Sequence, residues 1–125
     1  MPFKERDSVL IKNYSGHVLG LGVIVNVNEF REPNMRYAVD AQFYRDDYIF
    51  VGEGNLELFE EVDEEQMEAE YKRIADMIES EGLSYAISEG YVYSSMTHDV
   101  ELKVAIDKAQ MALDVIEEKL SKYMY

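Results

Sequence analysis

The first 60 residues alternate between apolar and polar positions with the period of two that is typical of β-strands. In residues 35–43, for example, Met35, Tyr37, Val39 and Ala41 fall on one face of an extended chain. Gly, Pro, Asn and Asp residues separate the alternating stretches and predict turns. Five short strands are therefore predicted, at residues 8–13, 21–28, 35–43, 48–51 and 56–59. Short, closely spaced strands favour a small barrel or a strongly curved sheet.

The period changes to that of a helix after the fifth strand. Met67, Tyr71, Ile74 and Ile78 follow one another at steps of four, three and four, which places them on one helical face. We therefore expect a helix over residues 63–81.

Polar residues and a glycine mark the ends of this helix. Asp63 is suited to the N-cap, with Gln66 three residues on as its capping-box partner. Gly82 is suited to end the helix, because glycine adopts a left-handed conformation at little cost. The residues that follow leave two alternatives open: a short helix at 83–88 followed by a loop, or a small extended piece at 91–93.

The C-terminal segment carries the clearest helical pattern. From about residue 97 to residue 122 it contains neither Gly nor Pro, and apolar residues recur at alternating steps of four and three. This seam has the a/d spacing of a heptad repeat and comprises Leu102, Ile106, Ala109, Leu113, Ile116 and Leu120. A second apolar strip beside it indicates a helix buried on two sides. One side is expected to pack on the 63–81 helix as an antiparallel hairpin, and the other on the sheet or another chain.

Self-association is expected from this two-sided helix. Tyrosines around the helices add to the expectation, because tyrosine is enriched at interfaces. We therefore predict a homodimer or larger oligomer whose contacts involve Leu102, Ile106, Leu113, Ile116 and Leu120.

Three glycines, Gly16, Gly20 and Gly22, raise the alternative of a phosphate-binding loop. Such a loop places its glycines between a strand and the N-terminus of a helix. The residues after Gly22, VIVNVN, instead favour a strand, and the Gly-Lys-Ser/Thr of a P-loop is absent. We expect Gly16 to supply a positive φ in a turn, and Gly20 and Gly22 to permit a bulge or a sharp bend.

The segments DSVLIKN, GHVLGLGVIVNV, YAVDA and DDYIFVGEGNLELFE together resemble an SH3-like barrel of the Tudor or KOW type, over residues 5–60. The resemblance implies a binding module, since such barrels usually recognise peptides, modified side chains, RNA or ribosomal surfaces. Nucleic-acid-binding members carry Lys or Arg clusters, whereas residues 1–56 here have a net charge of −2. The predicted fold is α+β: a five-stranded SH3-like barrel in residues 1–60, then a helical hairpin in residues 61–125.

Composition and charge exclude several classes of location, chemistry and partner. Apolar residues make up 47% of the chain, no stretch approaches the roughly 20 apolar residues of a membrane span, and the N-terminus MPFKERDSV lacks a signal-peptide core. The absence of cysteine excludes disulfides and thiolate chemistry. Of the net charge of −14, residues 57–81 carry −9. A cytoplasmic protein without a membrane or direct nucleic-acid partner is therefore expected, with a basic protein as a fitting partner.

Aromatic residues concentrate in the predicted barrel. Those that flank its turns, together with nearby arginines, are what a peptide or small-ligand groove uses. The alternative interpretation is core packing with ordinary surface tyrosines. The groove is predicted at Tyr14, Arg36, Tyr44, Arg45 and Tyr48.

Catalytic and metal-binding motifs are weak or absent. His98 adjoins Asp99 and could form a base–orienter pair, but no nucleophile motif accompanies it. The H-E-x-x-H pattern is missing, and no catalytic residue, metal or cofactor is expected. A non-catalytic interaction protein is favoured, such as a small accessory protein of a phage or bacterium; a carboxylate-dependent enzyme using Asp46 or Asp47 as base stays as an alternative.

The acidic segment supports a further alternative, an inhibitor that mimics nucleic acid. Its carboxylates would replace phosphates in the basic groove of a target. The acidic partner face would comprise Glu57, Glu60, Glu61, Glu64, Glu65 and Glu68. A solvated helix face is the simpler interpretation of the same residues.

Overall fold

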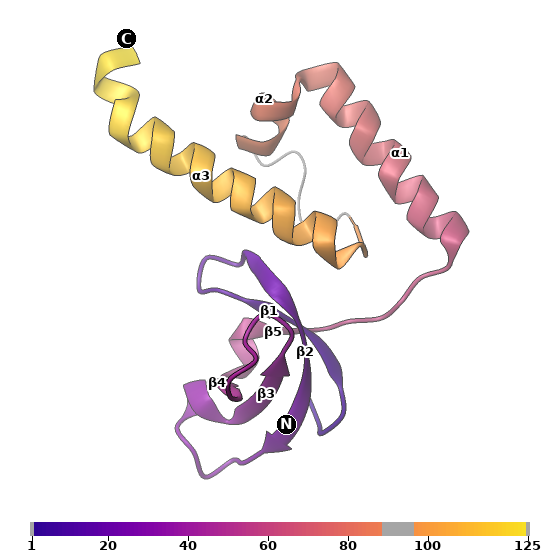
Figure 1. Cartoon of the computed structure of the whole chain (residues 1–125), viewed down its shortest axis with the longest axis vertical. Coiled ribbons are helices and arrows are strands. Elements are labelled where there is room, and N and C mark those ends of the chain that lie inside the picture. The colour runs from indigo at the N-terminus through magenta and orange to yellow at the C-terminus, as the bar shows by residue number, and fades with distance from the viewer. Residues whose placement is uncertain (1, 89–96, 125) are drawn as a thin grey trace. The chain divides into compact units, whose positions relative to one another are not determined.

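The computed structural model describes residues 2–88 and 97–124, and the chain divides into two compact units, Met1–Glu61 and Val62–Tyr125 (Figure 1). The division lies next to the boundary expected between residues 60 and 61. The first unit is a five-stranded antiparallel sheet and the second is helical. The α+β class predicted from the sequence is confirmed.

The sheet of the first unit has the strand order β4-β3-β2-β1-β5. Its strands are β1 (Ser8–Lys12), β2 (Val18–Val27), β3 (Tyr37–Ala41), β4 (Ile49–Val51) and β5 (Leu56–Leu58), and two short 3-10 helices, η1 (Pro33–Met35) and η2 (Glu53–Asn55), precede β3 and β5. The expectation of a closed barrel is wrong, because β4 and β5 do not pair in the described part of the chain. Each is three residues long, and η2 rather than a hairpin turn connects them.

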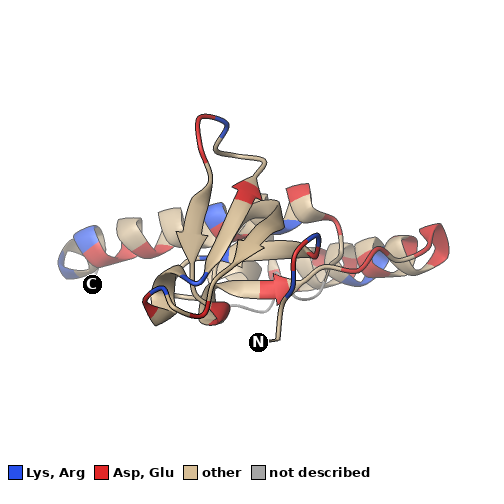
Figure 2. Cartoon of the chain, turned by 90° about the horizontal axis from the view of Figure 1, so that it is seen from below, with Lys and Arg blue, Asp and Glu red and all other residues tan. Residues whose placement is uncertain are grey.

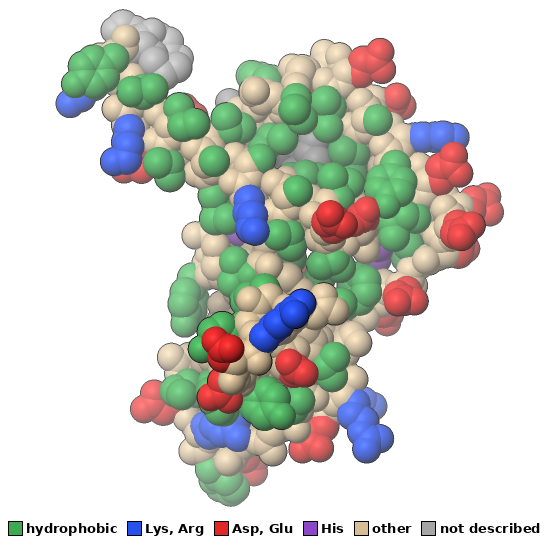
Figure 3. Space-filling view, viewed as in Figure 1, with side chains coloured by type: hydrophobic (Ala, Val, Ile, Leu, Met, Phe, Trp, Pro, Cys, Tyr) green, Lys and Arg blue, Asp and Glu red, His purple; other side chains and the backbone are tan. Residues whose placement is uncertain are grey.

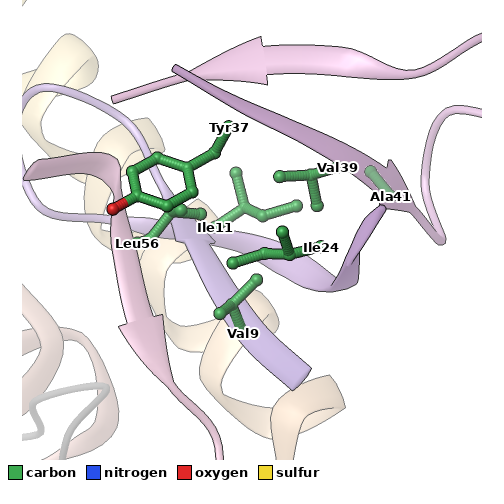
Figure 4. Packing of buried hydrophobic residues seen from close by; sticks show 7 residues of the cluster. All are labelled: Val9, Ile11, Ile24, Tyr37, Val39, Ala41 and Leu56. Atoms are coloured by element: carbon green, nitrogen blue, oxygen red, sulfur yellow. The ribbon is translucent and has the colours of Figure 1, made fainter. Parts of the chain in front are cut away.

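The core of the first unit lies on the concave face of this sheet. Val9, Ile11, Ile24, Tyr37, Val39, Ala41 and Leu56 are buried there in one cluster (Figure 4). The expected face of the third strand is confirmed for Tyr37, Val39 and Ala41. Met35, expected on the same face, lies in η1 instead and is exposed.

The three glycines allow particular backbone conformations in β2 and in the turn before it. Gly16 has a φ of 86°, so the expected turn conformation is confirmed. The register between β1 and β2 shifts beside Gly20, where Ile11 pairs with Gly20 but Lys12 pairs with Val18, so the expected bulge is also confirmed. β2 continues through Gly20 and Gly22 without a helix, which excludes the phosphate-loop alternative.

The second unit contains α1 (Glu64–Glu81), α2 (Leu83–Ser88) and α3 (Val100–Met124). Both expected ends of α1 are confirmed. The Asp63 carboxylate accepts a hydrogen bond from the Gln66 backbone N–H at 2.8 Å, and Gly82, with a φ of 85°, donates its N–H to the Ile78 carbonyl at 2.7 Å. The helical alternative for residues 83–88 is confirmed, whereas residues 91–93 lie outside the described residues.

The expectation that α1 and α3 pack lengthwise as a hairpin is wrong. The short helix α2 packs against both, and the buried cluster of this unit takes Ile74 from α1, Ala86 from α2 and Ile106 from α3 (Figure 1). Only the first part of α3 lies in this cluster, with Leu102 packed against it.

The Tyr37 side chain places a polar hydroxyl group in the apolar core of the first unit. Its ring is 1% exposed and meets the Phe3 ring edge-on at 5.6 Å, but its hydroxyl has no hydrogen-bond partner among the described residues (Figure 4). An unsatisfied buried hydroxyl costs about 1–3 kcal/mol.

We predict that Tyr37→Phe raises the free energy of unfolding by about 1 kcal/mol, because the ring packing is kept and the unsatisfied group is removed. Urea denaturation measures the change, and Tyr48→Phe, at a half-exposed tyrosine, serves as the control with no change. A loss of stability in Tyr37→Phe would show that the hydroxyl is bonded and would contradict the prediction.

Candidate binding groove

The first unit contains a groove of about 350 Å³. Its walls come from β4, from the adjoining ends of β1 and β2, and from the segments before and after β3. Six of its lining residues are aliphatic or phenylalanine, and Tyr14 adds a third aromatic ring. The full lining is Ile11, Lys12, Asn13, Tyr14, Leu19, Asn34, Phe43, Ile49, Phe50, Val51 and Asn55.

Three aromatic side chains of the groove are open to solvent. Tyr14 is 88% exposed, Phe43 49% and Phe50 43%. The Arg31 guanidinium lies 5.1 Å from the centre of the Phe50 ring, a cation–π distance. Arg31 also donates to the Asn26 side chain and to the carbonyls of Met35 and Arg36. Phe50 is therefore supported by an arginine that is itself held on several sides.

Phe43 is placed by the absence of a side chain at Gly20. A Cβ at Gly20 would lie 2.6 Å from the Phe43 Cδ1 atom, closer than real Cβ contacts. The ring thus covers the backbone of β2 directly. Gly20 has a second function beside the bulge: it makes room for one wall of the groove.

The polar residues of the groove are mostly engaged in holding the backbone. The Asn13 side-chain carbonyl accepts the backbone N–H groups of Ser15 and His17, both at 3.0 Å, which forms the turn that carries Tyr14. The Asn55 amide donates to the Lys12 carbonyl at 2.9 Å. These bonds connect the end of β1 to both neighbouring turns.

Among the residues that the structure describes, Lys12 is the one charged residue that lines the groove. Its ammonium lies 3.8 Å from a Glu57 carboxylate oxygen, an ion pair that is open to solvent and contributes little stability. No carboxylate of residues 2–88 and 97–124 belongs to the lining. The groove is therefore apolar with a partly neutralised positive charge at its border.

Only Tyr14 of the predicted groove residues lines this groove. Arg36, Tyr44, Arg45 and Tyr48 do not belong to its lining, and their part in binding stays a prediction. Arg36 follows η1, and the other three are exposed in the connection between β3 and β4, where the alternation of a strand gives no direction for a side chain.

The sequence interpretation missed Phe43 and Phe50. A signal for Phe50 exists: it is the middle residue of the strand Ile-Phe-Val, so alternation turns it away from its two inward neighbours. Phe43 follows β3 within a turn, and only the contact with Gly20 shows its position.

The proposed acidic face is divided between the two units. Glu57, Glu60 and Glu61 belong to the first unit, while Glu64, Glu65 and Glu68 lie on α1 in the second. Figure 2 shows acidic residues, coloured red, in both the sheet unit and the helices. On α1 the stripe is interrupted by a base, because Lys72 pairs with Glu68 at 3.7 Å.

The second unit contains a cluster of polar groups where α1 meets the start of α3. His98 and Asp99 do not pair with each other: the His98 Nδ1 atom lies 2.7 Å from the Glu70 carboxylate, and the Asp99 carboxylate accepts the Tyr71 hydroxyl. Glu70 is 4% exposed and also accepts the His98 backbone N–H. Asp99 further accepts the Leu102 backbone N–H at 3.0 Å, as an N-cap of α3 does.

These contacts change the pKa values of three groups. Burial acts to raise the pKa of Glu70, but hydrogen bonds from His98 and Thr97 and the attraction to His98 outweigh it, so the pKa is lowered from 4.5. The hydrogen bond from Tyr71, followed by the Leu102 N–H, lowers the pKa of Asp99. The same hydrogen bond raises the pKa of the Tyr71 phenol. The carboxylates are thus held in their charged forms, as structural links require.

Comparison with known proteins gives no relative: no protein-family model, curated protein or solved structure matches the chain. Within residues 2–88 and 97–124, no three His, Asp or Glu side chains form a possible metal site. The helices in this part of the chain include none that is both long and apolar enough to span a membrane. The function is therefore argued from the groove itself.

Substitutions of Gly20 and Gly22 test the groove and the core separately, because different side chains lie beside the two glycines. A Cβ at Gly22 would lie 2.7 Å from Val39 Cγ1 and 2.9 Å from Ile11 Cδ1, both buried, whereas the Phe43 ring beside Gly20 is half exposed.

We predict that Gly22→Ala lowers the free energy of unfolding by about 1–3 kcal/mol and that Gly20→Ala lowers it by less than about 1 kcal/mol. Gly20→Ala instead moves the Phe43 ring, which NMR detects as changed ring-proton shifts and lost contacts to β2. Equal destabilisation by the two changes would contradict the difference drawn between the groove and the core.

The Glu70 carboxylate makes the stability of the second unit depend on pH. Because its pKa in the folded state lies below 4.5, it contributes stability above that pH and loses the contribution as the pH falls through the folded-state pKa. We predict that Glu70→Gln lowers the stability at pH 7 and reduces its decline toward about pH 3. Asp99 keeps part of the decline, since its pKa is lowered too.

Urea denaturation followed by the helical circular dichroism signal at several pH values measures this change. Glu68→Gln is the matched control, because Glu68 is an exposed carboxylate on the same helix. An unaltered pH slope in Glu70→Gln, or an equal effect of Glu68→Gln, would refute the role given to the buried carboxylate.

Proposed function

We propose that the protein is a non-catalytic interaction protein whose first unit binds an apolar part of a protein partner in the groove beside β4. The observation that carries the proposal is the grouping of Tyr14, Phe43 and Phe50, all exposed, around one hollow of about 350 Å³. Exposed aromatic rings at a concave site supply contact area with little loss of side-chain entropy. Such a site suits a peptide side chain better than a charged group.

The charges of the groove support an apolar ligand over the alternatives. A pocket for a cationic side chain uses carboxylates beside its aromatic rings, and the lining here has none. Phosphate binding uses several bases, and Lys12, already paired with Glu57, is the single base among the described lining residues. The groove is therefore suited to a ligand that it recognises by shape and by apolar contacts.

Selection from a random heptapeptide display library tests the groove. We expect enriched peptides to share an aromatic or aliphatic position and to lose about tenfold or more in affinity, ~1.4 kcal/mol, for Tyr14→Ser or Phe50→Ser. Phe30→Ser is the matched control, because Phe30 is an aromatic of the same unit, 91% exposed and outside the lining. No enrichment, or equal losses in the control, would overturn the proposal.

We further propose that the C-terminal half of α3 binds a second copy of the chain. The heptad seam enters the intramolecular cluster at Ile106 and continues beyond it. There Ile116 is 52% exposed, Leu120 46% and Tyr123 75%. Figure 3 shows hydrophobic side chains, coloured green, at the surface of the C-terminal part of α3. A heptad seam pairs with another of the same spacing, which a second copy provides in a self-complementary interface. Leu102 and Ile106, expected in the interface, pack in the chain's own cluster instead.

Two neighbouring apolar residues provide a matched test of this pairing. Ile116 lies on the seam and Val115, 49% exposed, lies beside it. We predict that light scattering gives a mass of about twice 14.5 kDa for the wild type and for Val115→Asp, and about 14.5 kDa for Ile116→Asp. A monomeric wild type would refute the pairing without affecting the groove.

A further inference from the structure

The groove follows the edge of a strand as well as the face of a sheet. Ile49, Phe50 and Val51 are consecutive residues of β4, so their side chains alternate between the two faces, yet all three line the groove. A groove that touches consecutive residues runs along the side of the strand, where the backbone groups that do not face β3 are located. On that side β4 has no paired strand in the described part of the chain.

The two edge strands of the sheet, β5 and β4, differ in the charge that they carry. The edge strand β5 carries Glu57, which is ion-paired with Lys12, and a charge on an edge strand discourages pairing with another chain. β4 consists of Ile, Phe and Val and carries no charge or proline. An uncharged edge with high β-propensity is a template for an added strand.

We propose, on the basis of the binding groove proposed above, that the partner is an extended peptide segment that adds to the sheet beside β4. In this mode, main-chain hydrogen bonds provide affinity and alternate side chains provide specificity. The side chains on one face of the peptide would contact Phe43 and Tyr14 in the groove. The open sheet would gain a sixth strand where the barrel fails to close.

The charges around β4 define the flanks of this peptide. Asp46 and Asp47 precede the strand and Glu53 follows it, and Arg45 is the one base among these neighbours. A segment with apolar or β-branched residues at its centre and a Lys or Arg at each end matches this distribution. Charge on the flanks steers association and fixes the register more than it adds affinity.

The peptide acetyl-Lys-Thr-Val-Thr-Trp-Thr-Val-Lys-amide is a suitable probe. The protein contains no tryptophan, so emission excited at the tryptophan absorption edge reports on the peptide alone. Binding is measured by fluorescence titration of the full chain, and the same titration is followed through the backbone amide signals of residues 49–51. We expect saturable binding and the largest amide shifts in β4.

Methylation of single peptide nitrogens distinguishes strand addition from contact with side chains alone. In a strand, alternate N–H groups face the neighbouring strand, so N-methylation should weaken binding tenfold or more at every second position and have little effect at the positions between. Replacement of the two terminal lysines by glutamates should weaken binding at low salt, with the difference reduced at high salt.

Each other outcome overturns a defined part of the inference. Binding that is lost in Phe50→Ser but insensitive to N-methylation would retain the groove and refute strand addition. The absence of any binding by wild type, with no peptide enriched from the library, would refute both. The β4 amide signals could instead change when the protein is diluted but not when the peptide is added. That result would show that a second copy of the chain occupies the β4 edge, and it would refute the proposed peptide partner.

Discussion

The first unit depends on the close approach of other side chains to the backbone of β2. This ten-residue strand pairs with β1 and β3, and it lacks side chains at two positions where neighbours need the space. At Gly22 the space is filled by Val39 and Ile11 of the core, and at Gly20 by the ring of Phe43. The same strand therefore determines both the density of the core and one wall of the groove.

The incomplete closure of the sheet is the second feature with consequences for function. A closed barrel has no edges, whereas this sheet ends in two strands of three residues. One edge carries an ion pair, and the other is apolar and borders the groove. An uncharged edge is a template for pairing with another chain, and this edge borders the aromatic groove in which the proposed partner would bind.

The second unit is held together by polar links as much as by its small apolar cluster. Glu70 and Asp99 each accept hydrogen bonds that join α1 to the first turn of α3, over a separation of 28 residues in the sequence. These links position the beginning of α3, while the exposed seam lies toward its other end. Pairing of α3 with a second copy would bring two grooves into one assembly, so that a partner with repeated segments would bind through both at raised effective concentration.

Local patterns in the sequence were sufficient to predict the α+β class, the approximate strands, the α1 cap at Asp63 and the turn at Gly16. These features depend on periodicity and on the conformational preferences of single residues, which act over a few neighbours. Only the tertiary structure decided that the barrel stays open, that α2 packs against both long helices, that His98 pairs with Glu70 and that Phe43 and Phe50 form the groove with Tyr14. Those outcomes depend on contacts between residues far apart in the chain, whose geometry no local pattern contains.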